Sequence, residues 1–189
     1  QMTTTRLLVL FLVTFGFFNT GIVSASSITF NDFSSTAGLT LSGGAGAAVT
    51  SDGNVLRLTN ASYGQVGSAF SSTTINAAKF STSFEFRMTS PGGGFDGTGT
   101  GADGLVFVVQ PVSSSIGGYG GGLGYSGIWP SIGVEFDTWY NDVILDPDSN
   151  HIGINQNGNT TSLATLRVSP SFNDGSLWYA WINYDGTDL

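Results

Sequence analysis

The chain has 189 residues, enough for one domain with a sizeable core and too few for two typical ones. Charged residues make up only 10% of it, and the net charge is −8 with five Lys and Arg together, so no basic face is available for nucleic acid. The chain contains no cysteine, which excludes disulfides and thiolate metal sites, while 40% hydrophobic and 13% aromatic residues favour a folded core over disorder.

The N-terminus has the pattern of a secretory signal peptide. Arg6 precedes an apolar run over residues 7–18, and small residues follow at 23–25. A charged start, a short apolar stretch and a small-residue cleavage site are typical of such a peptide. The run is shorter than the ~20 residues that a transmembrane anchor needs. We therefore expect residues 1–25 to be removed on export, leaving a secreted, extracellular chain without a membrane span.

From residue 26 onward the pattern is that of short strands. Apolar and polar residues alternate as in half-buried strands, and residues 105–109 are continuously apolar, as in a strand buried on both faces. The predicted strands are 28–30, 55–59, 80–88, 105–109, 132–137, 163–168 and 177–184. Gly-rich segments at 90–101 and 113–127 separate some of them, and no segment after residue 25 has a clear helical period. This pattern predicts an all-β sandwich or barrel.

The strand predicted over residues 132–137 carries two carboxylates on one face. Strand alternation places Glu135 and Asp137 on the same side and turns Val134 and Phe136 to the other. Two neighbouring carboxylates repel each other unless they share a proton or a cation. This face is therefore a candidate cation site.

Three further candidate ligands follow at loop spacing, namely Asn141, Asp146 and His151, the only histidine of the chain. Carboxylates with an amide oxygen suit Ca²⁺, whereas carboxylates with an imidazole suit a transition ion such as Mn²⁺. One cluster therefore has ligands for two different metals. The residues alone leave a simpler interpretation open, in which the histidine is only hydrogen-bonded and the Asp146-Pro147 pair starts a turn.

The spacing E-x-D-x3-N-x4-D-x4-H, with its Asp-Pro pair and the His-Ile-Gly-Ile that ends it, resembles the metal-binding segment of legume lectins. The resemblance implies two metal ions and a metal-bound water held by Thr161, ten residues after the histidine. The implied ligands are Glu135 and His151 for Mn²⁺, Asp137 and Asp146 for both ions, and Asn141 and the backbone carbonyl of Trp139 for Ca²⁺.

Two more segments resemble the sugar-binding parts of the same family. Residues 101–104, Gly-Ala-Asp-Gly, resemble the segment in which a cis peptide, here Ala102–Asp103, precedes a sugar-binding Asp. Residues 120–125, Gly-Gly-Gly-Leu-Gly-Tyr, resemble a glycine loop whose backbone N–H approaches the sugar, and we assign that donor to Gly121.

The chemistry of a sugar ring explains this set of residues. The resemblance implies that Asp103 accepts hydrogen bonds from vicinal hydroxyl groups, while the Asn141 amide and the Gly121 N–H donate. Trp139 is expected to cover the apolar face of the ring, although the strand pattern alone would also allow a core aromatic at this position.

By this resemblance residues 26–189 form an L-type lectin domain, an antiparallel jelly-roll sandwich that binds glycans or glycoproteins reversibly and is not an enzyme. The family normally has further strands after the position of Leu189, so we expect the chain to be truncated at its C-terminus. The outer sheet surface decides whether the domain forms a homo-oligomer.

Two other functions compete with a lectin. Laminarinase-like hydrolases on a similar sandwich use the pattern E-x-D-x-x-E, in which two glutamates act as nucleophile and acid/base. The second position is Tyr140 here, so one catalytic carboxylate is missing. A secreted structural or adhesive surface protein is the other alternative, and the intact Asp103 and Asn141 argue against it.

Sequons at Asn60 and Asn159 can carry glycans in a eukaryotic host.

Overall fold

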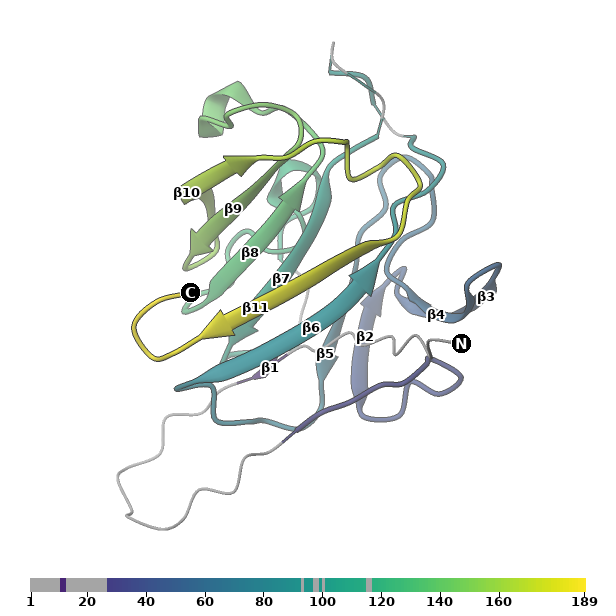
Figure 1. Cartoon of the computed structure of the whole chain (residues 1–189), viewed down its shortest axis with the longest axis vertical. Coiled ribbons are helices and arrows are strands. Elements are labelled where there is room, and N and C mark those ends of the chain that lie inside the picture. Colours follow the sequence, from purple (N-terminus) through teal and green to yellow (C-terminus); the bar gives the residue numbers. More distant parts are fainter. Residues whose placement is uncertain (1–10, 13–26, 93, 97–98, 100, 115–116) are drawn as a thin grey trace.

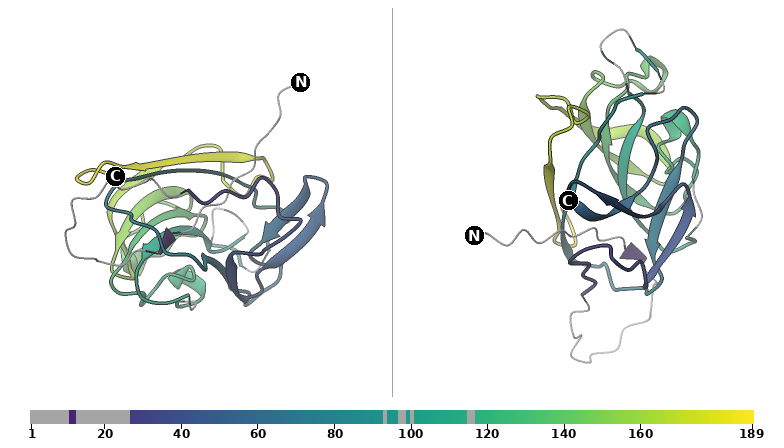
Figure 2. Two further views of the ribbon diagram at one scale, coloured as in Figure 1. Left: turned by 90° about the horizontal axis from the view of Figure 1, so that it is seen from below. Right: turned by 90° about the vertical axis from the view of Figure 1, so that its right-hand side faces the viewer.

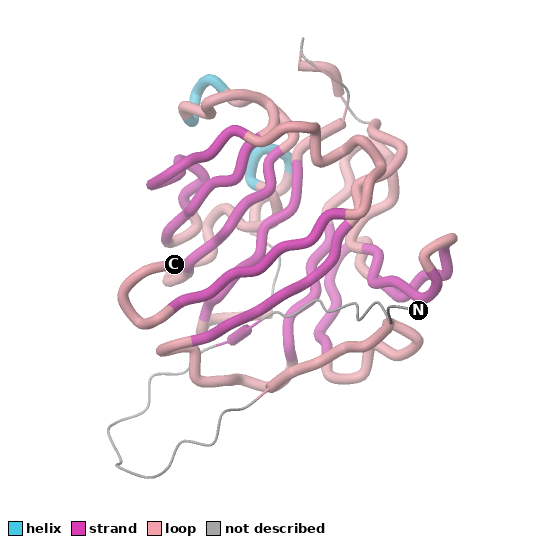
Figure 3. The backbone as a smooth tube through the Cα atoms, viewed as in Figure 1, coloured by secondary structure: helices cyan, strands magenta, loops and turns pink. Residues whose placement is uncertain are grey.

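The computed structural model describes residues 11–12, 27–92, 94–96, 99, 101–114 and 117–189. Strands dominate this part of the chain, and its helical residues form two short 3₁₀ turns, η1 (Gly120–Gly122) and η2 (Asp142–Ile144) (Figure 3). No described helix is long and apolar enough to cross a membrane. The predicted signal peptide lies outside the described residues except for Phe11–Leu12, which form β1.

The largest sheet has five strands in the order β1-β7-β8-β9-β10 (Figure 1). Strands β7 to β10 are antiparallel neighbours, and β1 pairs in parallel with the end of β7. Their bounds are Gly104–Gln110 for β7, Ile132–Asp137 for β8, His151–Gln156 for β9 and Asn159–Arg167 for β10. Antiparallel pairing brings residues that are far apart in the chain directly opposite each other.

A second layer lies over this sheet. It consists of β6 (Phe80–Phe86) and β11 (Trp178–Tyr184), which pair antiparallel and cross the five-stranded sheet as a separate layer (Figure 2). Two further antiparallel pairs complete the fold: β2 (Leu39–Gly43) with β5 (Gly67–Ser71), and between them in the chain the hairpin of β3 (Gly46–Thr50) with β4 (Gly53–Arg57).

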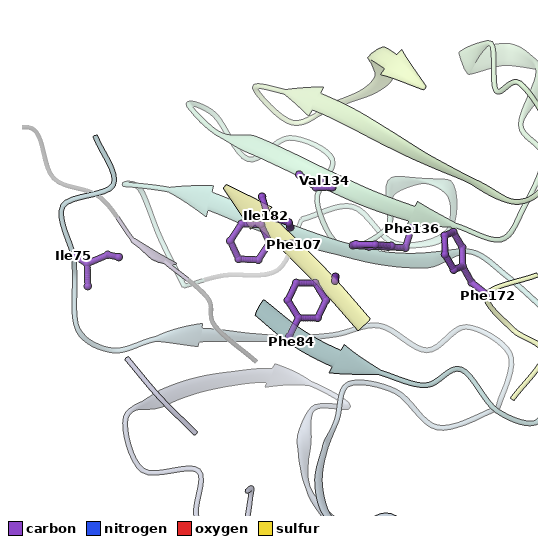
Figure 4. Close-up of a cluster of buried hydrophobic side chains, with 8 residues drawn as sticks. Ile75, Phe84, Phe107, Val134, Phe136, Phe172 and Ile182 are labelled. Carbon is purple, nitrogen blue, oxygen red and sulfur yellow. The ribbon is translucent and has the colours of Figure 1, made fainter. Parts of the chain in front are cut away.

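Aromatic side chains fill the space between the two layers. The Phe84 ring from β6 stacks on Phe107 of β7 with 6.0 Å between centroids, and meets Phe136 of β8 edge-on at 5.9 Å. Fully burying such a side chain contributes about 1.5–3 kcal/mol to folding. The buried cluster comprises Ile75, Phe84, Phe107, Val134, Phe136, Phe172, Ala180 and Ile182 (Figure 4).

The opposite face of the five-stranded sheet has a smaller apolar cluster. Val106 and Val108 of β7 point away from the main core and pack with Phe70 of β5 and with Tyr125 and Ile128. The last two residues belong to the glycine-rich segment 117–128, so this segment is held against the sheet by its own apolar side chains. The Tyr125 hydroxyl completes the attachment, because it lies 3.0 Å from the Ser131 hydroxyl and accepts a hydrogen bond from the Gly158 N–H.

The predicted all-β architecture is confirmed, and β8 has the predicted bounds. The predictions at 55–59, 80–88, 105–109, 163–168 and 177–184 each fall on a strand with shifted ends, whereas residues 28–30 form none. The pattern misses β2, β3, β5 and β9. β3 and β5 consist largely of Gly, Ala and Ser, which provide little hydrophobic alternation, whereas β2 and β9 do alternate but with only two apolar residues each. Sheet pairing rather than local pattern defines these strands.

Candidate metal and sugar site

Strand β8 divides its side chains between core and site as its alternation predicts. Val134 and Phe136 belong to the main core, while Glu135 and Asp137 face the other side and are each only 1% exposed. Carboxylates that are this deeply buried need a partner that compensates the loss of water.

The neighbouring strand β9 supplies the imidazole. In the register of β8 with β9, Asp137 lies opposite His151 and Glu135 lies opposite Gly153. The His151 ring is fully buried, and its Nε2 lies 3.4 Å from Glu135 Oε1 and 3.7 Å from Asp146 Oδ1. Ligand atoms of Asp137, Asp146 and His151 all lie within 4.8 Å of one another, so β8, β9 and the loop between them converge on one point.

The loop between β8 and β9 is shaped by its own backbone hydrogen bonds. The Trp139 N–H donates to Asp137 Oδ1 at 2.6 Å, and the Asn141 N–H donates to Asp146 Oδ2 at 2.8 Å. Leu145 adopts a left-handed conformation with φ of 66°, which turns the chain back toward Asp146. Each carboxylate thus uses one oxygen to hold the loop and leaves the other for a ligand.

Two buried polar atoms at this point lack a hydrogen-bond partner among the described residues, His151 Nε2 and Asn141 Oδ1. An orphaned imidazole nitrogen and an orphaned amide oxygen are costly unless a ligand satisfies them. The His151 Nδ1 atom, in contrast, lies 3.0 Å from the Asp148 carbonyl oxygen, which fixes the ring and turns Nε2 toward the carboxylates.

The shifted pKa values of this cluster indicate that it lacks compensating positive charge. Burial raises the pKa of Asp137 to about 8, and burial also raises the pKa of Asp146. Burial by itself would lower the pKa of His151, but the carboxylates around the ring, led by Glu135, outweigh it and raise that pKa. Without a cation, the cluster therefore favours bound protons over free carboxylates.

The donor set fits divalent cations. Nε2 of His151 with carboxylates is a ligand set for a transition ion such as Mn²⁺, and Asn141 Oδ1 with carboxylates is one for Ca²⁺. The fold therefore brings the predicted ligands Glu135, Asp137 and Asp146 together with both of these groups, the imidazole and the amide.

The predicted sugar-binding residues also meet beside this cluster. The expected cis peptide Ala102–Asp103 is present, and the Asp103 carbonyl accepts a hydrogen bond from the Thr138 N–H at 2.9 Å. A Cβ built on Gly120 would lie 3.9 Å from Asp103 Oδ2, and one built on Gly121 would lie 3.3 Å from the Asn141 amide nitrogen. The glycine turn η1 therefore reaches both side chains. Burial raises the pKa of Asp103.

Trp139 lies at the edge of this group rather than in either apolar cluster. It is partly buried, and its indole ring is covered on one side by the backbone of Gly94, where a Cβ would collide with ring atoms. The next residue, Tyr140, donates its N–H to Asp96 Oδ2 at 3.1 Å. The segment 94–96 thus contacts both the Trp139 indole and the backbone of the loop that follows β8.

Two polar residues of this region are absent from the predicted set. The Ser162 hydroxyl on β10 lies 2.5 Å from Glu135 Oε1, and the Asn155 amide on β9 donates to Glu135 Oε2 at 2.5 Å. The lectin spacing assigns Thr161 near the metal, whereas the hydroxyl that reaches Glu135 is that of the next residue, Ser162, in a part of β10 with an irregular register between Asn159 and Ala164. The Asn that ends the His-Ile-Gly-Ile-Asn run was the available signal for Asn155.

Comparisons with known proteins agree with this geometry. A family model described as the legume lectin domain matches residues 25–189. Lectin-4 of Griffonia simplicifolia is 38% identical over 117 residues, which cover 58% of this chain and 46% of that protein. Bark agglutinin I polypeptide A of Robinia pseudoacacia is 33% identical over 161 residues, or 75% of this chain and 53% of that protein. The chain therefore spans about half the length of these relatives.

Another relative is a receptor kinase that contains an L-type lectin domain. The L-type lectin-domain containing receptor kinase VIII.1 of Arabidopsis thaliana is 36% identical over 115 residues, or 57% of this chain and 15% of that protein. Among solved structures, the Lotus tetragonolobus seed lectin superposes with a TM-score of 0.63 at 27% identity, over 82% of this chain and 70% of that one. The winged bean acidic lectin, complexed with methyl-α-D-galactose, superposes with a TM-score of 0.60 at 30% identity, over 82% and 67%.

The two-layered antiparallel fold and its buried acidic cluster define a β-sandwich lectin domain. The chain belongs to the legume lectin domain family. Lectins of this family are non-enzymatic carbohydrate-binding proteins, which confirms the prediction that the domain described here is not an enzyme.

Proposed function

We propose that this domain binds carbohydrate reversibly, in a Ca²⁺- and Mn²⁺-dependent manner, outside the cell. The observation that carries the proposal is the convergence of Asp103, the glycine turn η1 and Asn141 next to the cluster around His151. These residues come from separate loops, and their meeting at one point is not required by the apolar core.

Each group has a part that its chemistry suits. Asp103, partly exposed, offers two carboxylate oxygens to the hydroxyl groups of a sugar, and the Asn141 amide and the Gly121 N–H offer donors from the opposite side. The free side of the Trp139 indole can cover the C–H face of the ring. No bond is broken, since Tyr140 replaces the second catalytic glutamate of sandwich hydrolases.

The metal centre would hold this arrangement in place. Glu135, Asp137, Asp146 and His151 would bind Mn²⁺, and Asn141 with the two shared aspartates and the Trp139 carbonyl would bind Ca²⁺. The cations supply the positive charge that the buried carboxylates lack. Asn141 belongs to both the cation set and the sugar set: a cation bound at its unpaired Oδ1 would orient the amide and leave the nitrogen to donate to the sugar.

Glycans or glycoproteins are accordingly the proposed partners, and galactosides are the first ligands to test, since the winged bean acidic lectin was solved with methyl-α-D-galactose. The apolar run with its charged start near residue 6 supports export as a secreted protein. Exposed Leu163 and Leu166 on the edge strand β10 are compatible with a homo-oligomer.

A glycan array on the metal-loaded protein, followed by calorimetric titration of the strongest hit, tests the proposal. Asp103→Ala is expected to abolish binding while the melting temperature is retained. Asp142→Ala is the matched control, because Asp142 is an exposed aspartate beside Asn141 that faces away from the buried cluster. Full affinity of Asp103→Ala for the same glycan would refute the site, and an empty array with fully loaded metal would favour a structural role.

A further inference from the structure

The glycine-rich segment that contains η1 is folded on itself. Near its ends, the Gly118 N–H donates to the Ser126 carbonyl at 2.8 Å. Between them, the Leu123 N–H donates to the Gly120 carbonyl at 2.7 Å and closes η1. Segment 117–126 is therefore a compact unit, and the position of η1 depends on where this unit is attached to the rest of the domain.

One buried side chain attaches the unit to the sheet. Tyr125 is 0% exposed, and its backbone is tied to η1 because its N–H donates to the Gly122 carbonyl at 2.8 Å. Its hydroxyl lies 3.0 Å from Ser131 Oγ, next to the start of β8, and accepts a hydrogen bond from the Gly158 N–H in the turn between β9 and β10 at 3.0 Å. Tyr125 therefore connects η1 with the ends of three strands.

The hydrogen bonds of this network are mutually consistent. The Gly158 N–H also reaches Ser131 Oγ at 3.1 Å, and the Ser131 hydroxyl donates to the Ile128 carbonyl. Since that proton is already used, the Tyr125 hydroxyl donates its own proton to Ser131 Oγ. All of these groups are buried, so loss of the phenol oxygen would leave the Gly158 N–H with one acceptor in place of two.

The sheet and the turn leave room for the segment by omitting side chains. A Cβ built on Gly133 of β8 would lie 3.1 Å from two atoms of the Tyr125 ring. In the turn between β9 and β10, Asn157 and Gly158 both have positive φ, 58° and 70°, and a Cβ on Gly158 would collide with the backbone N of Ile128. Both glycines are thus explained by the segment that packs on them.

The attachment of the unit sets the geometry at the proposed sugar site. A Cβ built on Gly120 would lie 3.9 Å from Asp103 Oδ2, and one built on Gly121 would lie 3.3 Å from the Asn141 amide nitrogen. Because η1 moves with the whole unit, a displacement of the segment would change both separations together.

We propose that Tyr125, through Ser131 and Gly158, is a positioning residue that holds η1 in place for sugar binding. The inference rests on the proposed function for the existence of the sugar ligand. Tyr125 is fully buried, so it acts without touching the sugar. If the segment is detached part of the time, the apparent affinity falls in proportion to the fraction of chains in which it is in place.

Tyr125→Phe tests the assignment, since it removes the hydroxyl and keeps the ring that packs with Phe70 and Val108. A glycan array that includes galactosides, scanned at graded concentrations of the full chain in Ca²⁺ and Mn²⁺, gives an apparent affinity for each glycan that the wild type binds. Tyr125→Phe is expected to lose about 2- to 10-fold in that affinity, the range that one buried hydrogen bond typically contributes. Adding Ser131→Ala removes both acceptors of the Gly158 N–H and should increase the loss.

Ile182→Val is the matched control. It removes one methyl group from the main core, outside the apolar cluster that contains Tyr125, and should lower the melting temperature by a similar amount. Its glycan affinity is expected to equal that of the wild type.

Hydrogen exchange of residues 117–126, followed by mass spectrometry without sugar, gives a second measurement that general destabilisation would not confine to this segment. Exchange there should be about 2- to 10-fold faster in Tyr125→Phe and unchanged in Ile182→Val. Wild-type glycan affinity in Tyr125→Phe would overturn the inference alone, as would reduced affinity with wild-type exchange, or an equal loss of affinity in Ile182→Val. A wild-type chain that binds no glycan on the array would overturn it together with the proposed function.

Discussion

Removing the metals should make the stability of the domain fall as pH rises, and Asp137 sets the size of the effect. This side chain is 1% exposed, and burial raises its pKa from 3.8 to about 8. A carboxyl whose pKa is higher in the folded than in the unfolded state stabilises the fold while it is protonated. That stability is fully present below about pH 4 and is lost as pH rises through about 8.

The magnitude follows from the displacement of the pKa. At about 1.4 kcal/mol per unit, a shift from 3.8 to about 8 corresponds to roughly 5–6 kcal/mol. For a chain of this size each kcal/mol changes the melting temperature by about 2–4 °C, so the expected fall is roughly 10–20 °C. The raised pKa values of Asp103, Asp146 and His151 act in the same direction.

Thermal unfolding in EDTA, recorded from about pH 4 to about pH 9, measures this dependence, and the same series with Ca²⁺ and Mn²⁺ should be nearly flat because the cations compensate the charge. Asp137→Asn in EDTA is the control. The amide oxygen can still accept the bond from the Trp139 N–H, but the titrating group is gone. A metal-free melting temperature that is constant or rises with pH would refute the reasoning, and so would an Asp137→Asn series with the wild-type slope.

Three further outcomes are expected. Gly121→Ala should weaken glycan binding in calorimetry, because the new methyl would crowd the Asn141 side chain at 3.3 Å. Unchanged glycan affinity would contradict the position of η1. Phe136→Ala should lower the free energy of unfolding, measured in urea, by about 3–5 kcal/mol, because its ring contacts three core aromatics. A loss below about 1 kcal/mol would mean that the core collapses around the gap. Tyr140→Glu should not create hydrolysis of chromogenic glycosides, because this residue lies beyond the end of β8 and is 43% exposed, away from the buried Glu135. Turnover above that of the wild type would contradict this expectation.

The position of the candidate metal ligands on one face could be predicted from the sequence because β8 is regular. Its period of two assigns Val134 and Phe136 to the core and Glu135 and Asp137 to the site, as the structure has them. A strand that is buried on one face cannot slip by one residue without exchanging these sets. Local pattern was therefore sufficient here.

Strands built from small and polar residues could not be predicted in this way. In β3, Gly46–Thr50, hydrophobic alternation is weak, and in β9, His151–Gln156, only Ile152 and Ile154 carry it. These strands form because neighbouring strands satisfy their backbone hydrogen bonds, which is a property of the sheet.

By itself, the sequence determined the fold class, the alternation of β8 and the identity of the residues that could bind cations and sugar. Tertiary structure decided which of them meet. It set Asp137 opposite His151 and brought η1 to Asp103 and Asn141. It also placed the Ser162 hydroxyl against Glu135, because an irregular strand register cannot be counted from a regular period and depends on how β10 pairs with β9.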